Sequence, residues 1–192
     1  MEKRNWKHIV TLKQRMVLCL AAFFAAFALQ LALNGYQARA VQQVQDDQMG
    51  NFNAISRFQG GVESSISILE AYRWENGETE EMLEKLQAAC STSNAWLWRI
   101  RSNMDGLQNV SDEQWVLYGA VETTYGSYNT LLEELESYLS SGQEAKASQL
   151  YYNKVSVCGG YLSQYTMQLL KASILDAQTT YTEISELGER IA

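Results

Sequence analysis

The stretch Leu83–Leu107 reads LEKLQAACSTSNAWLWRIRSNMDGL, and its pattern decides the fold class. Steps of three and four residues alternate without a break through Leu83, Leu86, Cys90, Ser93, Leu97, Ile100, Met104 and Leu107. Such spacing places side chains on one face of a helix and, when it persists, is typical of a heptad seam. We therefore predict a long helix with one buried face that begins near Thr79.

The segment that follows repeats this pattern. Ser111 and Gln114 form a capping-box pair that predicts a helix start, and Ser140-Ser141-Gly142 predicts its end. The predicted buried face of this third helix consists of Tyr118, Val121, Tyr125, Tyr128, Leu132, Leu135 and Leu139.

The two outer segments also carry apolar stripes. The first ends before a predicted turn at Asn76-Gly77, and its stripe consists of Val41, Val44, Phe52, Ile55, Val62, Ile66 and Leu69. The last helix runs from about Gln143 to the end, with the stripe Tyr151, Val155, Cys158, Leu162, Tyr165 and Leu169. After a shift of register, this stripe continues as Ile174, Ala177, Tyr181, Ile184 and Ile191.

The composition agrees with a chain built from helices. It contains no proline, which helix interiors exclude. Four amphipathic helices joined by short turns predict an all-α protein, an up-down-up-down four-helix bundle over residues 36–192. Because the first and last helices are the longer pair, we expect both to extend toward the membrane.

A membrane is expected because of residues 16–33, which read MVLCLAAFFAAFALQLAL. As a helix this stretch spans about 27 Å, close to the hydrocarbon thickness of a bilayer. We predict a transmembrane helix over 16–35 and a cytoplasmic tail over 1–15, which holds five Lys and Arg residues. The alternative is a cleaved signal peptide with Ala38-Arg39-Ala40 as its site, although the apolar run is long for that.

The charge balance restricts the partners of the remaining chain. The whole chain has 15 Lys and Arg against 22 Asp and Glu, a net charge of −7, and five of the basic residues lie in the tail. The part outside the membrane is therefore strongly acidic, which argues against nucleic-acid binding. The positive tail places residues 36–192 outside the cytoplasm and the protein in the cell membrane.

No motif for catalysis is present. The single histidine, His8, lies in the tail, and no glycine-rich phosphate loop or nucleophile elbow occurs. We therefore expect no enzyme activity, no cofactor and no metal site in this chain. Cys90 and Cys158 lie on predicted seams and either pack in the core or form a disulfide, which an oxidising exterior permits.

The candidate ligand-binding residues are Trp96, Trp98, Arg99 and Arg101. Trp96 and Trp98 are two residues apart, so they point in nearly opposite directions and cannot both face the core. One of them is expected at a surface or ligand pocket, and the alternative is that the aromatic residues mainly fill the core.

The basic Lys3–Lys7 tail, the segment Thr11–Arg15 leading into the 16–33 span, and the long helix that follows resemble the start of bacterial membrane sensors. The layout is most similar to sensor histidine kinases of two-component systems, and next to chemoreceptors with helical bundles. The resemblance implies a signal-sensing input region that moves its helices when a small molecule or a protein binds, and it implies a homodimer. In such receptors a second span and the catalytic part follow, so no kinase residue is carried over. The alternative is an anchored helical adaptor without enzymatic activity that binds another protein.

The predicted topology can be tested by labelling. An impermeant biotinylation reagent applied to intact cells should modify Lys85 and Lys146 and leave Lys3 and Lys7 unmodified. The reverse pattern would place the acidic part in the cytoplasm.

Overall fold

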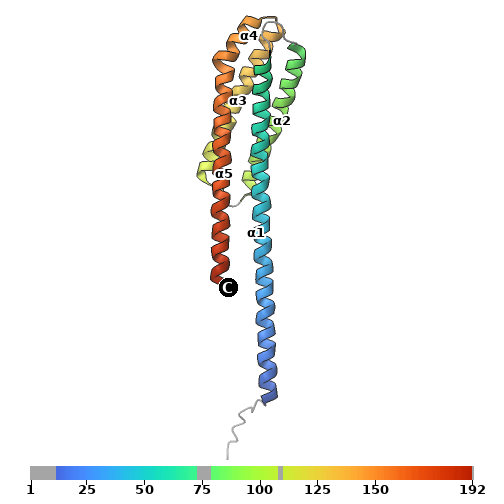
Figure 1. Cartoon of the computed structure of the whole chain (residues 1–192), viewed down its shortest axis with the longest axis vertical. Helices are drawn as coiled ribbons and strands as arrows, with labels where there is room; N and C mark the ends of the chain where they lie inside the picture. Colours follow the sequence, from blue (N-terminus) through green and yellow to red (C-terminus); the bar gives the residue numbers. More distant parts are fainter. Residues whose placement is uncertain (1–11, 73–78, 108–109, 192) are drawn as a thin grey trace, which may run out of the picture. The chain divides into compact units, whose positions relative to one another are not determined.

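The computed structural model describes residues 12–72, 79–107 and 110–191, and nearly all of them are helical (Figure 1). The helices are α1 (Leu12–Ala71), α2 (Thr79–Gly106), α3 (Asp112–Ser140), α4 (Glu144–Leu150) and α5 (Ser156–Ile191), with a π-helical turn, η1 (Tyr151–Val155), between α4 and α5. No strand occurs in these three ranges, which confirms the all-α prediction.

The chain divides into two compact units, Met1–Gln43 and Val44–Ala192. In the first unit the described residues belong to α1, and their apolar side chains are exposed; they include Val17, Leu20, Phe23, Phe24, Phe27 and Leu31. Among the described helices, only α1 is both long and apolar enough to cross a membrane.

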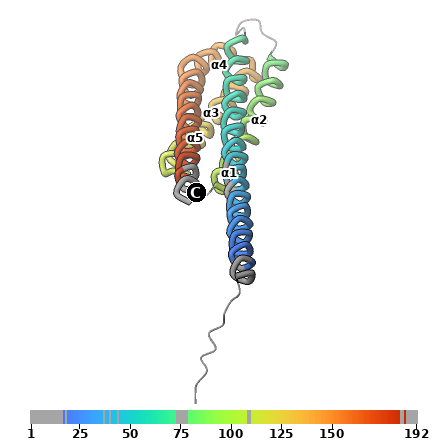
Figure 2. Tube along the Cα trace, turned by 60° about the horizontal axis from the view of Figure 1, so that its bottom comes forward, coloured from blue at the N-terminus to red at the C-terminus, as the bar shows by residue number. Residues whose placement is uncertain are grey.

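In the second unit, the later part of α1 lies beside α2, α3 and the α4–η1–α5 run (Figures 1 and 2). The buried side chains form one apolar core to which all of these segments contribute. The largest fully buried side chains are Tyr128, Phe58, Ile55, Leu69, Ile100, Met104, Leu135, Leu162 and Leu169. With 60 and 36 residues, α1 and α5 are longer than α2 and α3, which have 28 and 29.

The predicted faces of α2 and α3 are largely confirmed. All seven predicted core positions of α3 are buried. On α2, five of the eight predicted positions are buried, while Leu83, Cys90 and Leu107 are half-buried. On α1, Ile55, Val62 and Leu69 are buried as predicted.

The prediction for α1 was wrong at Phe52, which is 37 % exposed, and it left out Phe58, which is fully buried. The Phe58 ring lies edge-on to Tyr125 of α3, with a centroid separation of 5.2 Å. Phe58 was missed because it lies one turn from both Ile55 and Val62, between positions that the pattern had already assigned to the face.

The predicted face of the last helix was also partly wrong. Cys158 and Tyr165 are half-buried, and the following residues, Gly159 and Thr166, are buried instead. A Cβ atom at Gly159 would lie 3.1 Å from Ile66 and 3.3 Å from Tyr128, so α5 approaches its neighbours where its side chain is smallest. The hydrophobic pattern does not mark glycine or threonine as core positions. The π-helical turn just before α5 also changes the helical phase of the positions that follow it.

Further along α5 the predicted continuation was wrong as well. Ile174 and Tyr181 are 40 % and 65 % exposed, whereas Thr180 is buried. The Thr180 hydroxyl donates to the carbonyl of Asp176 at 3.0 Å, so its polar group is satisfied within the helix. A threonine can therefore take a buried position that the pattern reserved for larger apolar residues.

The start of α3 agrees with the prediction only in part. Ser111 caps the helix, and its hydroxyl accepts from the Gln114 N–H at 3.3 Å. The Gln114 amide does not complete the capping box; it donates to Ser173 of α5 at 3.1 Å. The turn after α3 is confirmed, with Gly142 at a φ of +71°. The predicted Asn76-Gly77 turn lies outside the described residues.

Neighbouring glycines on α1 have opposite environments. A Cβ atom at Gly61 would overlap the Ser93 hydroxyl and lie 3.4 Å from the Ser93 Cβ, whereas a Cβ atom at Gly60 would meet nothing within 4 Å. Gly61 therefore permits the close approach of α1 to α2, and Gly60 faces open space.

This difference predicts opposite effects of alanine at adjacent positions. Gly60→Ala should raise stability by about 0.5–1 kcal/mol, because alanine is the better helix former. Gly61→Ala should lower it by about 1–3 kcal/mol, because the new methyl group overpacks the contact with Ser93. Urea unfolding of both variants measures the difference, and equal effects would contradict the close approach at Gly61.

Candidate functional site

Three residue contacts define how α1 and α2 pass each other. Gly50 faces Asn103, Gly61 faces Ser93, and the Tyr72 and Thr79 hydroxyls are 2.7 Å apart. Residue numbers rise along one helix as they fall along the other, so the two helices are antiparallel. At the same offset, Arg57 lies level with Trp96, and Ile68 lies level with Lys85.

A groove of about 660 Å³ lies between these helices; we call it the α1–α2 groove. The residues that line it are Ser56, Arg57, Gly60, Gly61, Ser64 and Ile68 of α1 and Lys85, Ala88, Ala89, Thr92 and Trp96 of α2. Most of these side chains are small, which leaves room for the opening. The larger lining side chains, Arg57, Ile68, Lys85 and Trp96, lie toward its two ends.

The lining of the α1–α2 groove is cationic although the chain as a whole is acidic. Arg57 and Lys85 line it, and no aspartate or glutamate does. Lys85 forms an ion pair with Glu81, one turn earlier on α2. Arg57 forms no ion pair with any residue that the structure describes. The groove therefore favours a negatively charged or neutral guest over a cation.

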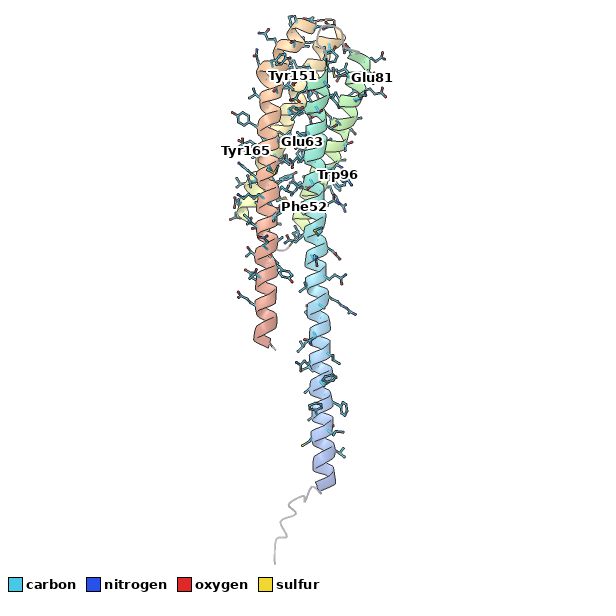
Figure 3. All side chains as sticks on the ribbon, in the orientation of Figure 1. Phe52, Glu63, Glu81, Trp96, Tyr151 and Tyr165 are labelled. Carbon is cyan, nitrogen blue, oxygen red and sulfur yellow. The ribbon has the colours of Figure 1, made fainter. Side chains whose placement is uncertain are left out.

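Only one of the four predicted ligand-binding residues, Trp96, lines this groove. Figure 3 shows Trp96 lower on α2 than Glu81, which is near the start of the helix. Trp98 is 67 % exposed, and Arg99 is exposed as well. Arg101 reaches α3 instead, where its guanidinium lies 3.5 Å from the Glu122 carboxylate.

Sequence reasoning missed the α1 half of the groove. Ser56, Gly60 and Ser64 recur every four residues, so they share one helix face, but small residues also occur on faces without function. Arg57 has no sequence neighbour that sets it apart. Its position level with Trp96 depends on a contact between segments far apart in the sequence.

A second groove of about 400 Å³ lies between α2 and α3. It is lined by Leu83, Leu86, Gln87, Cys90, Ser91 and Asn94 of α2 and by Tyr125, Asn129, Leu132, Glu133 and Glu136 of α3. The Gln87 amide donates to Glu136 at 2.8 Å, and the Tyr125 hydroxyl donates to the carbonyl of Cys90 at 2.8 Å. These bonds use polar groups of the lining to join the two helices.

The thiols are not activated. Burial, and then the negative charge of Glu136, raises the pKa of Cys90 from 9.0 to about 11, and burial also raises the pKa of Cys158. Both thiols are free and pack half-buried against the core, and the Cys158 thiol donates to the carbonyl of Thr124 at 3.7 Å. A protonated thiol is a poor nucleophile, so this arrangement favours the packing role that the sequence left open.

Comparisons with protein families, curated proteins and solved structures found no match for this chain. The geometry of the two grooves is therefore what bears on function.

The raised thiol pKa predicts a loss of stability in alkali. Between pH 9 and 11 the Cys90 thiol ionises in the unfolded chain and stays protonated in the folded one, so the folded state holds more protons. Stability must fall as pH rises through this window. The melting temperature of the whole chain in detergent should drop from pH 8 to pH 10, and Cys90→Ala should show a smaller drop. An identical slope in both proteins would mean that Cys90 is not shielded from water.

Proposed function

We propose that this chain is the membrane-anchored input region of a signal-transducing receptor, with the α1–α2 groove as the place where the signal binds. One observation carries the proposal: the helix that provides half of the groove, α1, is also the described helix that is apolar enough to cross a membrane. A guest that contacts Arg57 or Ser64 therefore acts directly on the helix that leads to the bilayer.

The proposed architecture supports this role. In it, residues 44–192 form an up-down-up-down four-helix bundle outside the cytoplasm, and residues 16–35 cross the cell membrane. The exposed apolar side chains of Leu20, Phe23 and Phe27 favour a lipid environment over water. The lengths of α1 and α5 suit a pair of helices that both extend toward the membrane, as in sensor histidine kinases and chemoreceptors, which this chain resembles in layout.

The proposed mechanism is a change in helix packing. A guest that touches both α1 and α2 favours the packing in which both contacts are made, and it shifts the equilibrium only by its difference in affinity for the two packings. The contact at Gly61 carries little side-chain volume, so small displacements of α1 along α2 disturb few other contacts. In a homodimer, such displacements would pass to the partner across the membrane.

A second candidate function is a membrane-anchored adaptor that binds another protein. The observation in its favour is the exposed apolar surface of η1 and α5, which includes Tyr152, Val157, Tyr161, Met167, Leu175 and Tyr181. Exposed apolar surface of this kind is typical of protein-binding faces. It favours a partner on α5, whereas the receptor proposal needs a guest between α1 and α2.

The receptor proposal predicts that occupation of the groove changes α1 beyond the groove. The whole chain in lipid nanodiscs should be screened with a library of neutral, cationic and anionic fragments by thermal shift. Bound fragments should raise the melting temperature. Hydrogen exchange of those complexes should then change in residues 44–50 of α1 as well as in the groove.

The control is Gly60→Leu, which fills the groove and should abolish both effects. Fragments that bind the groove without any change in residues 44–50 would contradict the receptor proposal. Exchange that changes only on α5, after addition of a protein, would favour the adaptor.

A further inference from the structure

The lining of the α1–α2 groove also indicates the chemistry of its guest. We propose that the groove binds an aromatic carboxylate, with Arg57 holding the carboxylate and Trp96 packing against the ring. This inference rests on the proposed function, because it names the class of signal that the input region would receive.

The charge of the groove excludes most other classes. It has two cationic side chains and no acidic one, so a cationic guest finds no counter-charge there. A zwitterion such as an amino acid would leave its ammonium group unpaired, and an unpaired charge in a partly enclosed site is costly. A guest with a single negative charge and no positive charge satisfies the lining best.

The spacing of the two cations selects a carboxylate over a more highly charged group. Ile68, level with Lys85, lies eleven positions beyond Arg57 on α1, about 16 Å along the helix axis. The two cations therefore act at separate ends and cannot both grip one phosphate. Arginine alone can bind a carboxylate through two parallel N–H···O bonds, and Lys85 is already engaged by Glu81.

The aromatic part of the proposal comes from Trp96. It lies level with Arg57 across the groove and is half-buried, so one side of its ring system packs on the protein while the remainder is accessible. A ring in the guest that stacks on the indole gains both buried area and a favourable aromatic geometry. Gly60, on the same stretch of α1, leaves the space for that ring.

The hydroxyl groups in the lining fit a guest of this kind. The Thr92 hydroxyl donates to the carbonyl of Ala88 at 2.9 Å, so toward the groove it can only accept. An N–H on the ring of the guest would supply a matching donor. An indole ring carries such a donor, which makes indole compounds suitable probes.

Three probes with the same ring separate the charge classes: indole-3-acetate is an anion, indole-3-ethanol is neutral, and tryptamine is a cation. Calorimetric titration of the whole chain in nanodiscs should show the tightest binding for indole-3-acetate and the weakest for tryptamine. Arg57→Gln should weaken indole-3-acetate at least about tenfold and leave indole-3-ethanol nearly unchanged, because only the anion uses the guanidinium.

Matched controls separate the site from general effects. Arg99→Gln removes an exposed cation on α2 outside the groove and should not change binding. Gly60→Leu should abolish binding, whereas Gly126→Leu, at another exposed helical glycine with open space beside it, should not. Far-UV circular dichroism of each variant checks that the helices are retained.

Each contrary result has a separate meaning. If none of the probes binds, or if all three bind equally, the carboxylate assignment is wrong. Binding that survives Gly60→Leu would place the guest outside the groove and overturn the site. A neutral or cationic fragment that binds the groove and alters residues 44–50 would leave the receptor proposal standing and overturn this inference. Indole-3-acetate that binds through Arg57 without altering residues 44–50 would do the opposite.

Discussion

α1 and α2 meet at Gly61, where nothing larger than a hydrogen atom fits against the Ser93 hydroxyl. Protein interiors are close-packed, so two helix backbones approach this closely only where a side chain is missing. The Ser93 hydroxyl donates to the carbonyl of Ala89 at 3.0 Å and therefore needs no partner on α1. This contact sets the level of one helix against the other, and the pairing of Arg57 with Trp96 follows from it.

The α1–α2 groove is a second consequence of the same small residues. Gly61 closes the contact on the side that faces the core, and Gly60, the preceding residue, leaves an opening on the outer side. A long charged side chain and an aromatic ring, which an ordinary helix pair would keep apart, thus lie on two walls of one opening. In the proposed receptor, closeness of packing and space for a signal come from adjacent residues, so that a guest acts where the helices have the fewest side chains to rearrange.

Buried hydrogen bonds then determine which faces can pair. The Ser65 hydroxyl donates to the carbonyl of Val62 at 2.7 Å, so the Tyr128 hydroxyl, 3.0 Å away, is the donor of the bond that joins α3 to α1. Tyr125 donates to α2, and Gln114 donates to α5. A slip of any helix would leave these buried groups without partners, at a cost of about 1–3 kcal/mol each. Apolar packing alone would tolerate such slips more readily, so the polar pairs select one arrangement.

The sequence by itself determined that this protein is all-α, where α2 and α3 begin and end, and which face of α3 is buried. It could do so because large apolar residues recur on α3 at helical spacing and because turn residues stand between the helices. Only the tertiary structure decided the face of α5 and the composition of the α1–α2 groove. Both depend on glycine, serine and threonine at the closest helix contacts, and these residues carry no hydrophobic signal. The same limit applies to the candidate site: Trp96 could be singled out from its own sequence neighbourhood, but its cationic neighbour across the groove is Arg57 of α1, which only the packing of two distant segments brings level with it.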